Sequence, residues 1–192
     1  MRKPYPESMF PARGTRAFRK SFVTMGLPVP PQTEVLIVAQ CWSEEPDAEA
    51  IVHRAIETAA SMVGADTGDA ELAVMLTDDA GIRVLNKNWR GQDKPTNVLS
   101  FPALQPTGSS PDDAPRMLGD IAIAWETTRR EADEEQKPFD HHLSHLAVHG
   151  FLHLVGYDHD NDVGAEAMEH LERDILRLLG IPDPYTDQDR IS

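Results

Sequence analysis

Hydrophobic residues follow a regular pattern from residue 34 onward, in which short apolar runs are interspersed with stretches of helical spacing. Short runs rich in β-branched residues are typical of strands, and apolar residues that recur every three or four positions are typical of helices. The pattern predicts strands at 35–39, 71–76, 98–101 and 118–124, and helices at 47–63, 81–89, 126–136, 140–155 and 165–179. Because the first strand is wholly apolar, we expect it to be buried on both faces.

These elements do not alternate strictly, which favours an α+β domain with one mixed sheet backed by helices. We expect this domain to cover residues 32–183. Residues 102–117, rich in Pro, Ser and Asp, are predicted to form a surface insertion. The Pro-rich, basic residues 1–31 are predicted to be a disordered extension, and residues 184–192 a tail.

Charge is unevenly distributed in this chain of 192 residues, whose net charge is −14. Residues 1–20 hold six basic residues and one acidic residue, so the acidic excess lies in the rest of the chain. A domain with this acidic excess lacks the basic surface that is typical of nucleic-acid-binding proteins. DNA is therefore not an expected partner, and RNA would require a local basic strip or a partner that supplies the attraction.

Cysteine content and hydropathy indicate the compartment. The single cysteine, Cys41, excludes an internal disulfide and is typical of a reducing compartment, so we predict a cytoplasmic protein with a buried, inert thiol. The sequence contains no run of about 18 apolar residues, so no membrane partner is expected.

Three histidines in the segment 149–159 suggest a metal site. His149 and His153 are one helical turn apart and therefore lie on one face of the predicted helix. His159 can join them only if the helix ends and the chain turns back, and Gly156 stands where that break is needed. Three protein ligands leave a coordination position open, as in catalytic zinc sites. The pattern predicts a metal-dependent hydrolase, and we leave the other histidines outside the ligand set.

The spacing of these histidines is also that of metzincin-type peptidases, whose general base is a glutamate directly after the first histidine. Here that position is Gly150, so a peptidase or amidase becomes the second hypothesis. Arg90, between a predicted helix and strand, offers a cation that can hold a phosphate with two parallel hydrogen bonds. Lys94 could add a second phosphate contact.

The segment from His149 to His159 resembles the signature His-Gly-x-Leu-His-Leu-x-Gly-Tyr-Asp-His of the YbeY family of endoribonucleases. The segments 90–101 and 118–121 resemble two further signatures of that family, with Asn97 where many relatives have aspartate. The resemblance covers about residues 35–180.

This resemblance implies a zincin-like metal-binding helix, one Zn²⁺ held by the three histidines, and Arg90 as the residue required for cleavage. It also implies a single-stranded rRNA substrate, 3′-end maturation of 16S-type rRNA, ribosome assembly and quality control, and the small ribosomal subunit with its assembly factors as partners. A non-catalytic assembly factor is the third hypothesis. Water and the neighbouring 2′-hydroxyl remain open as the nucleophile.

Overall fold

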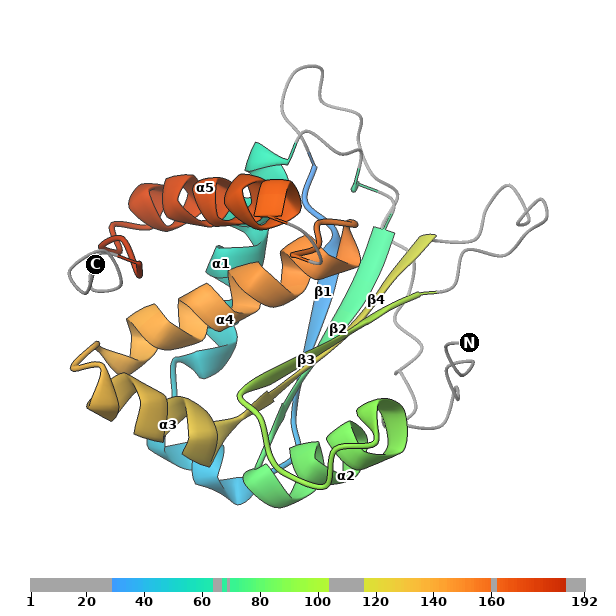
Figure 1. The fold of residues 1–192 in the computed structure, drawn as a ribbon, viewed down its shortest axis with the longest axis vertical. Helices are drawn as coiled ribbons and strands as arrows, with labels where there is room; N and C mark the ends of the chain where they lie inside the picture. Colours follow the sequence, from blue (N-terminus) through green and yellow to red (C-terminus); the bar gives the residue numbers. More distant parts are fainter. Residues whose placement is uncertain (1–28, 64–66, 69, 104–115, 160–161, 186–192) are drawn as a thin grey trace.

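The computed structural model describes residues 29–63, 67–68, 70–103, 116–159 and 162–185. Its four strands form one mixed sheet in the order β1-β2-β4-β3, in which the first three are parallel and β3 pairs antiparallel with β4 at the edge. The strands are β1 (Gln32–Ile37), β2 (Ala70–Thr77), β3 (Val98–Pro102) and β4 (Arg116–Ala124). The predicted α+β fold with one mixed sheet is confirmed (Figure 1).

Five helices cover the two faces of this sheet (Figure 1). They are α1 (Ala48–Met62), α2 (Asp79–Arg90), α3 (Trp125–Glu134), α4 (Phe139–Leu154) and α5 (Asp162–Leu178), with a 3₁₀ helix η1 (Gln40–Glu44) after β1. Helices α1 and α4 bury one face of the sheet, α5 packs against these two helices, and α2 packs with a smaller cluster on the other face. Alternate residues of β2 point to opposite faces, as the pleat of a strand requires: Leu72, Val74 and Leu76 face the larger core, and Ala73 and Met75 the smaller one.

Strand β1 departs from its predicted burial. It begins three residues earlier than predicted, its residues are only partly buried, and Ile37 is 52% exposed. The reason is its position: β1 pairs with β2 alone and forms an edge of the sheet. The prediction of a strand buried on both faces was therefore wrong, since it treated an edge strand as an inner one.

The segments that the sequence assigned to an extension, an insertion and a tail lie largely outside the described residues, which exclude 1–28, 104–115 and 186–192. The described ends of the predicted insertion belong to strands, because β3 includes Pro102 and β4 starts at Arg116. The predicted tail begins with two residues that contact the domain. Lys137 Nζ donates to the carbonyl of Pro184 at 3.0 Å, and the hydroxyl of Tyr185 donates to the carboxylate of Glu172.

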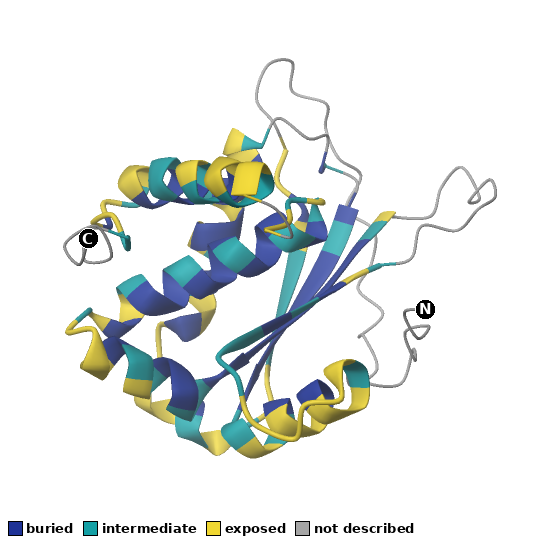
Figure 2. Cartoon of the chain, in the orientation of Figure 1, coloured by how far each residue is buried: buried dark blue, intermediate teal, exposed yellow. Residues whose placement is uncertain are grey.

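Helix α4 is buried along most of its length between the sheet and α1 (Figure 2). The predicted core positions Leu143, Leu146, Val148 and Leu152 are all buried. Gly150 lies against the sheet, where a Cβ atom would be 3.0 Å from Ile121 Cγ2 and 3.2 Å from Ser100 Oγ. A side chain at this position would require α4 or the sheet to shift by a few tenths of an ångström, so the glycine lets the last turns of α4 pack close to the sheet.

Candidate metal centre

The last two turns of α4 and the chain that follows bring His149, His153 and His159 together. One ring nitrogen from each lies within 4.8 Å of the others. The chain reverses at Gly156, whose φ of +98° is a left-handed conformation, and the amide of Tyr157 donates to the carbonyl of Leu152 at 3.0 Å. Within the described residues this is the one group of three or more potential side-chain ligands close enough to share a metal ion.

Hydrogen bonds define which nitrogen of two rings carries the proton. His149 Nδ1 lies 2.8 Å from Glu172 Oε1, and His153 Nδ1 lies 3.0 Å from the carbonyl oxygen of Tyr157. Carboxylate and carbonyl oxygens only accept, so both Nδ1 atoms are assigned as donors and both Nε2 atoms keep a lone pair. These two Nε2 atoms are 3.1 Å apart. Two lone pairs at this distance repel unless a cation lies between them, so the donor set fits a metal ion that prefers imidazole nitrogen.

The pKa of His153 also supports a metal site at this position. Burial, followed by the neighbouring His149 and His159, lowers the pKa of His153 below its ordinary value of 6.5. The ring is therefore neutral at neutral pH, and a neutral imidazole is the form that binds a metal.

Glu172 is a part of this site that the sequence analysis missed. Burial alone would raise the pKa of Glu172, but hydrogen bonds from His145 and His149 outweigh it and hold the pKa well below its ordinary value. The signal in the sequence is its position: Glu172 falls on the face of α5 that also carries Met168, Ile175 and Leu176, all of them buried. A carboxylate on an apolar helical stripe needs a partner, and here the partners are histidines.

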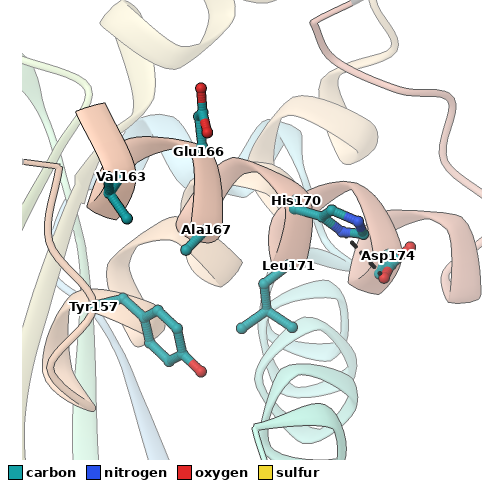
Figure 3. Close-up of a pocket in the computed structure, with 7 residues that line it drawn as sticks. All are labelled: Tyr157, Val163, Glu166, Ala167, His170, Leu171 and Asp174. Carbon is teal, nitrogen blue, oxygen red and sulfur yellow. Dashed lines mark ion pairs between the residues drawn. The ribbon is translucent and has the colours of Figure 1, made fainter.

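Three further histidines bond to carboxylates and lie outside the ligand cluster. His145 Nε2 lies 3.0 Å from Glu172 Oε2, one turn before the ligand positions. His142 Nε2 lies 2.9 Å from Glu131 Oε2. His170 is exposed in a shallow hollow along α5, where its Nδ1 lies 3.4 Å from Asp174 Oδ2 (Figure 3). None of these three rings belongs to the cluster of potential ligands among the described residues.

Arg90 is the last residue of α2 and is exposed to solvent. Helix α2 packs on the face of the sheet opposite α4 (Figure 1), and no hydrogen bond or ion pair joins Arg90 to the three histidines among the described residues. Lys94 is also exposed.

Asp93 lies close in sequence to Arg90, Asp158 directly precedes His159, and both aspartates accept hydrogen bonds from neighbouring groups. Asp93 accepts hydrogen bonds from Lys87 at 2.8 Å and Arg83 at 2.7 Å, and these bonds lower the pKa of Asp93 to about 2. Asp158 Oδ1 accepts a hydrogen bond from the amide of His159 at 2.8 Å, which orders the turn that carries this histidine.

Gly150 decides between two hydrolase classes. Its Cα faces Ile121 and Ser100 of the sheet, so a side chain at this position would be directed into the core rather than toward solvent. A peptidase of the metzincin type needs a carboxylate here as general base. Both the residue and its direction therefore argue against the peptidase hypothesis.

Comparison with known proteins decides the family. Residues 38–180 match the family described as Endoribonuclease YbeY. The chain belongs to the YbeY family. It is 77% identical over 164 residues to an Endoribonuclease YbeY of Rhodopseudomonas palustris (strain BisB18), covering 85% of this chain and 98% of that protein. It is 71% identical over 183 residues to an Endoribonuclease YbeY of Nitrobacter hamburgensis, covering 95% of this chain and 96% of the relative.

The chain also matches the solution structure of TM1509 from Thermotoga maritima, with a TM-score of 0.46 and 24% identity, over 83% of this chain and 93% of that one. Membership of the YbeY family confirms the resemblance read from the sequence and the assignment to the endoribonucleases, a class of hydrolase. Within the described ranges, no helix combines the length and the apolar character that crossing a bilayer demands.

Proposed function

We propose that this chain is a zinc-dependent endoribonuclease of the cytoplasm that cleaves single-stranded rRNA. Its role would be 3′-end maturation of 16S-type rRNA and quality control, with the small ribosomal subunit and its assembly factors as partners. The observation that carries the proposal is the facing pair of Nε2 lone pairs of His149 and His153, with His159 beside them. Family membership supplies the reaction class.

His149, His153 and His159 would hold the zinc ion through ring nitrogens. When bound, zinc supplies a Lewis acid for a phosphoryl oxygen and lowers the pKa of a coordinated water toward ~7. The protein contributes the orientation of the rings, through Glu172 for His149 and through the Tyr157 carbonyl for His153.

Arg90 would hold the RNA backbone through its guanidinium fork. Among the exposed cations of α2, Arg83 and Lys87 are already paired with Asp93. Within the described residues no ion pair engages Arg90, so its guanidinium is available to a phosphate without first displacing a carboxylate.

The net charge of −14 makes tight binding of naked RNA unfavourable. We therefore propose that the ribosome presents the RNA, so that Arg90, Lys94 and the metal act locally. The purified protein should bind naked RNA weakly. Tight binding by the core domain, with a steep salt dependence, would contradict this part of the proposal.

The experiment compares zinc content and cleavage of a labelled single-stranded RNA for the native protein, His153→Ala and Arg90→Glu. We expect His153→Ala to lose zinc and cleavage, and Arg90→Glu to keep zinc but lose cleavage. Arg54→Glu is the matched control, since Arg54 is exposed on α1. Native activity without bound metal would refute the metal role, and full activity of Arg90→Glu would refute the arginine role.

Two further arms separate the alternatives. Cleavage of a strand with a 2′-deoxy nucleotide at the scissile position would exclude the neighbouring 2′-hydroxyl as nucleophile. Unchanged rRNA processing in cells that carry either variant would instead support a non-catalytic assembly factor.

A further inference from the structure

Glu172 collects three hydrogen-bond donors in a buried position beside the candidate metal centre. Its Oε1 accepts from His149 Nδ1, and its Oε2 accepts from His145 Nε2 and from the hydroxyl of Tyr185. We propose that Glu172 is a positioning residue for His149, and that Tyr185 acts through Glu172, so that docking of residues 181–185 sets the affinity of the site for zinc. This deepens the proposed function and rests on its metal site.

The first step of the argument concerns the carboxylate. Glu172 is 1% exposed, so none of its acceptor capacity is satisfied by bulk water. A carboxylate has no proton to donate, and each of its three neighbours must therefore donate. For His149 this places the proton on Nδ1 and leaves Nε2 free for a metal, with the ring held in a single orientation.

Without Glu172, the orientation and the tautomer of the His149 ring are no longer fixed. The torsion that rotates an imidazole about its Cβ–Cγ bond has broad wells, so an unanchored ring populates several orientations and both neutral tautomers. Only a fraction of these present Nε2 to His153 and His159. Removing such an outer hydrogen-bond partner typically weakens metal binding 10- to 100-fold.

The third step concerns the segment after α5, which is fixed to the domain at several points. Ile181 is buried in the larger core, and its amide donates to the carbonyl of Leu176 at 2.9 Å. The Pro184 carbonyl accepts from Lys137 Nζ at 3.0 Å. The guanidinium carbon of Arg173 lies 5.1 Å from the centre of the Tyr185 ring. These contacts direct the Tyr185 hydroxyl onto Glu172.

Tyr185 is suited to be a permanent donor. Burial, followed by the nearby charge of Glu172, raises the pKa of its hydroxyl above the ordinary value, so the hydroxyl keeps its proton. The rings of Tyr185 and His145 also pack edge to face, with their centroids 5.8 Å apart. The hydroxyl thus fixes the same carboxylate oxygen that His145 contacts.

The test measures the zinc dissociation constant by competition with a chromophoric chelator, and separately the denaturant unfolding of the metal-free protein. Glu172→Gln keeps the volume but replaces one acceptor oxygen with a donor, and we expect zinc binding to weaken 10- to 100-fold. Tyr185→Phe removes only the hydroxyl, and we expect a loss of about two- to tenfold. Glu166→Gln is the matched control on the same helix, since Glu166 is exposed on α5.

The combined variant tests whether Tyr185 acts through Glu172. In the Glu172→Gln background, Tyr185→Phe should change the zinc dissociation constant by less than twofold. Full additivity of the two losses would overturn the coupling. Native zinc affinity in both single variants would overturn the whole proposal, including when the metal-free protein is destabilised, since that result would assign Glu172 a structural role only.

The zinc measurement does not depend on RNA. If the native protein binds zinc and the variants follow the expected order but no RNA is cleaved, the proposed function fails and this inference stands. If RNA is cleaved and the variants bind zinc like the native protein, the proposed function stands and this inference fails.

Discussion

Replacing Gly150 with alanine should have two opposite effects on the free energy of unfolding, and the contacts around Gly150 indicate which effect is larger. Alanine favours a helix interior over glycine by about 1 kcal/mol, so helix propensity alone predicts a more stable protein. The new Cβ atom would lie 3.0 Å from Ile121 Cγ2, 3.2 Å from Ile121 Cδ1 and 3.2 Å from Ser100 Oγ. Contacts this short require α4 or the sheet to shift by a few tenths of an ångström.

Such a shift is costly at this position because Ile121 is fully buried within the larger core. Overpacking of a core costs about 1–3 kcal/mol. Subtracting the gain in helix propensity leaves an expected loss of ~1 kcal/mol in the free energy of unfolding. For a chain of this size the midpoint of thermal unfolding should fall by about 2–4 °C.

The assay is guanidinium unfolding of the metal-free protein, with Ala167→Gly as the control. Ala167 is exposed on α5, so this change measures the helix-propensity difference without a packing contribution and should cost about 1 kcal/mol. An increase in stability for Gly150→Ala would refute the reasoning, because it would mean that the helix and the sheet can separate without cost.

Three further predictions concern His153, Asn97 and Trp42. Because the pKa of His153 is lowered from 6.5, the folded metal-free protein binds fewer protons than the unfolded chain; its stability should therefore fall as pH drops below about 6.5, and His153→Ala should flatten that part of a pH titration of unfolding. Asn97→Asp replaces the amide that donates to Glu131 Oε2 at 2.9 Å with a second carboxylate and should cost about 1–3 kcal/mol at pH 7; the loss should shrink as the pH is lowered and the carboxylates take up protons, and a loss that stays constant down to acid pH would contradict the electrostatic explanation. Trp42→Phe removes the donor of a buried 2.8 Å hydrogen bond to the carbonyl of Thr77 and should lower the free energy of unfolding by ~3 kcal/mol, with native stability as the contrary result.

The elements of the fold could be predicted from the sequence because their signals are local. The apolar positions of α4 follow helical spacing, and the histidines, the glycine break and the return lie within eleven consecutive residues. The burial of β1 could not be predicted, because an edge strand and an inner strand share the same apolar run and differ only in the number of neighbours.

The rest of the candidate site depends on tertiary contacts. Glu172 lies 23 residues after His149, and only the packing of α5 against α4 shows that the two meet. Read along the sequence, Glu172 is one of several acidic residues on α5. Tyr185 falls in the segment that composition assigned to a tail, because a short stretch after a Gly-x-Pro helix stop has no periodicity of its own.

The order of the elements along the chain has a consequence for biosynthesis. The four strands of the sheet lie between residues 32 and 124, whereas the candidate ligands begin at residue 149. The hydrogen-bond partner of His149, Glu172, lies on α5, and Tyr185, which donates to Glu172, follows α5. During translation the sheet is therefore complete before the first ligand has been made. Glu172 and Tyr185 are made after all three candidate ligands, so under the proposal above the nascent site would hold zinc about 10- to 100-fold more weakly until α5 and the segment after it have emerged.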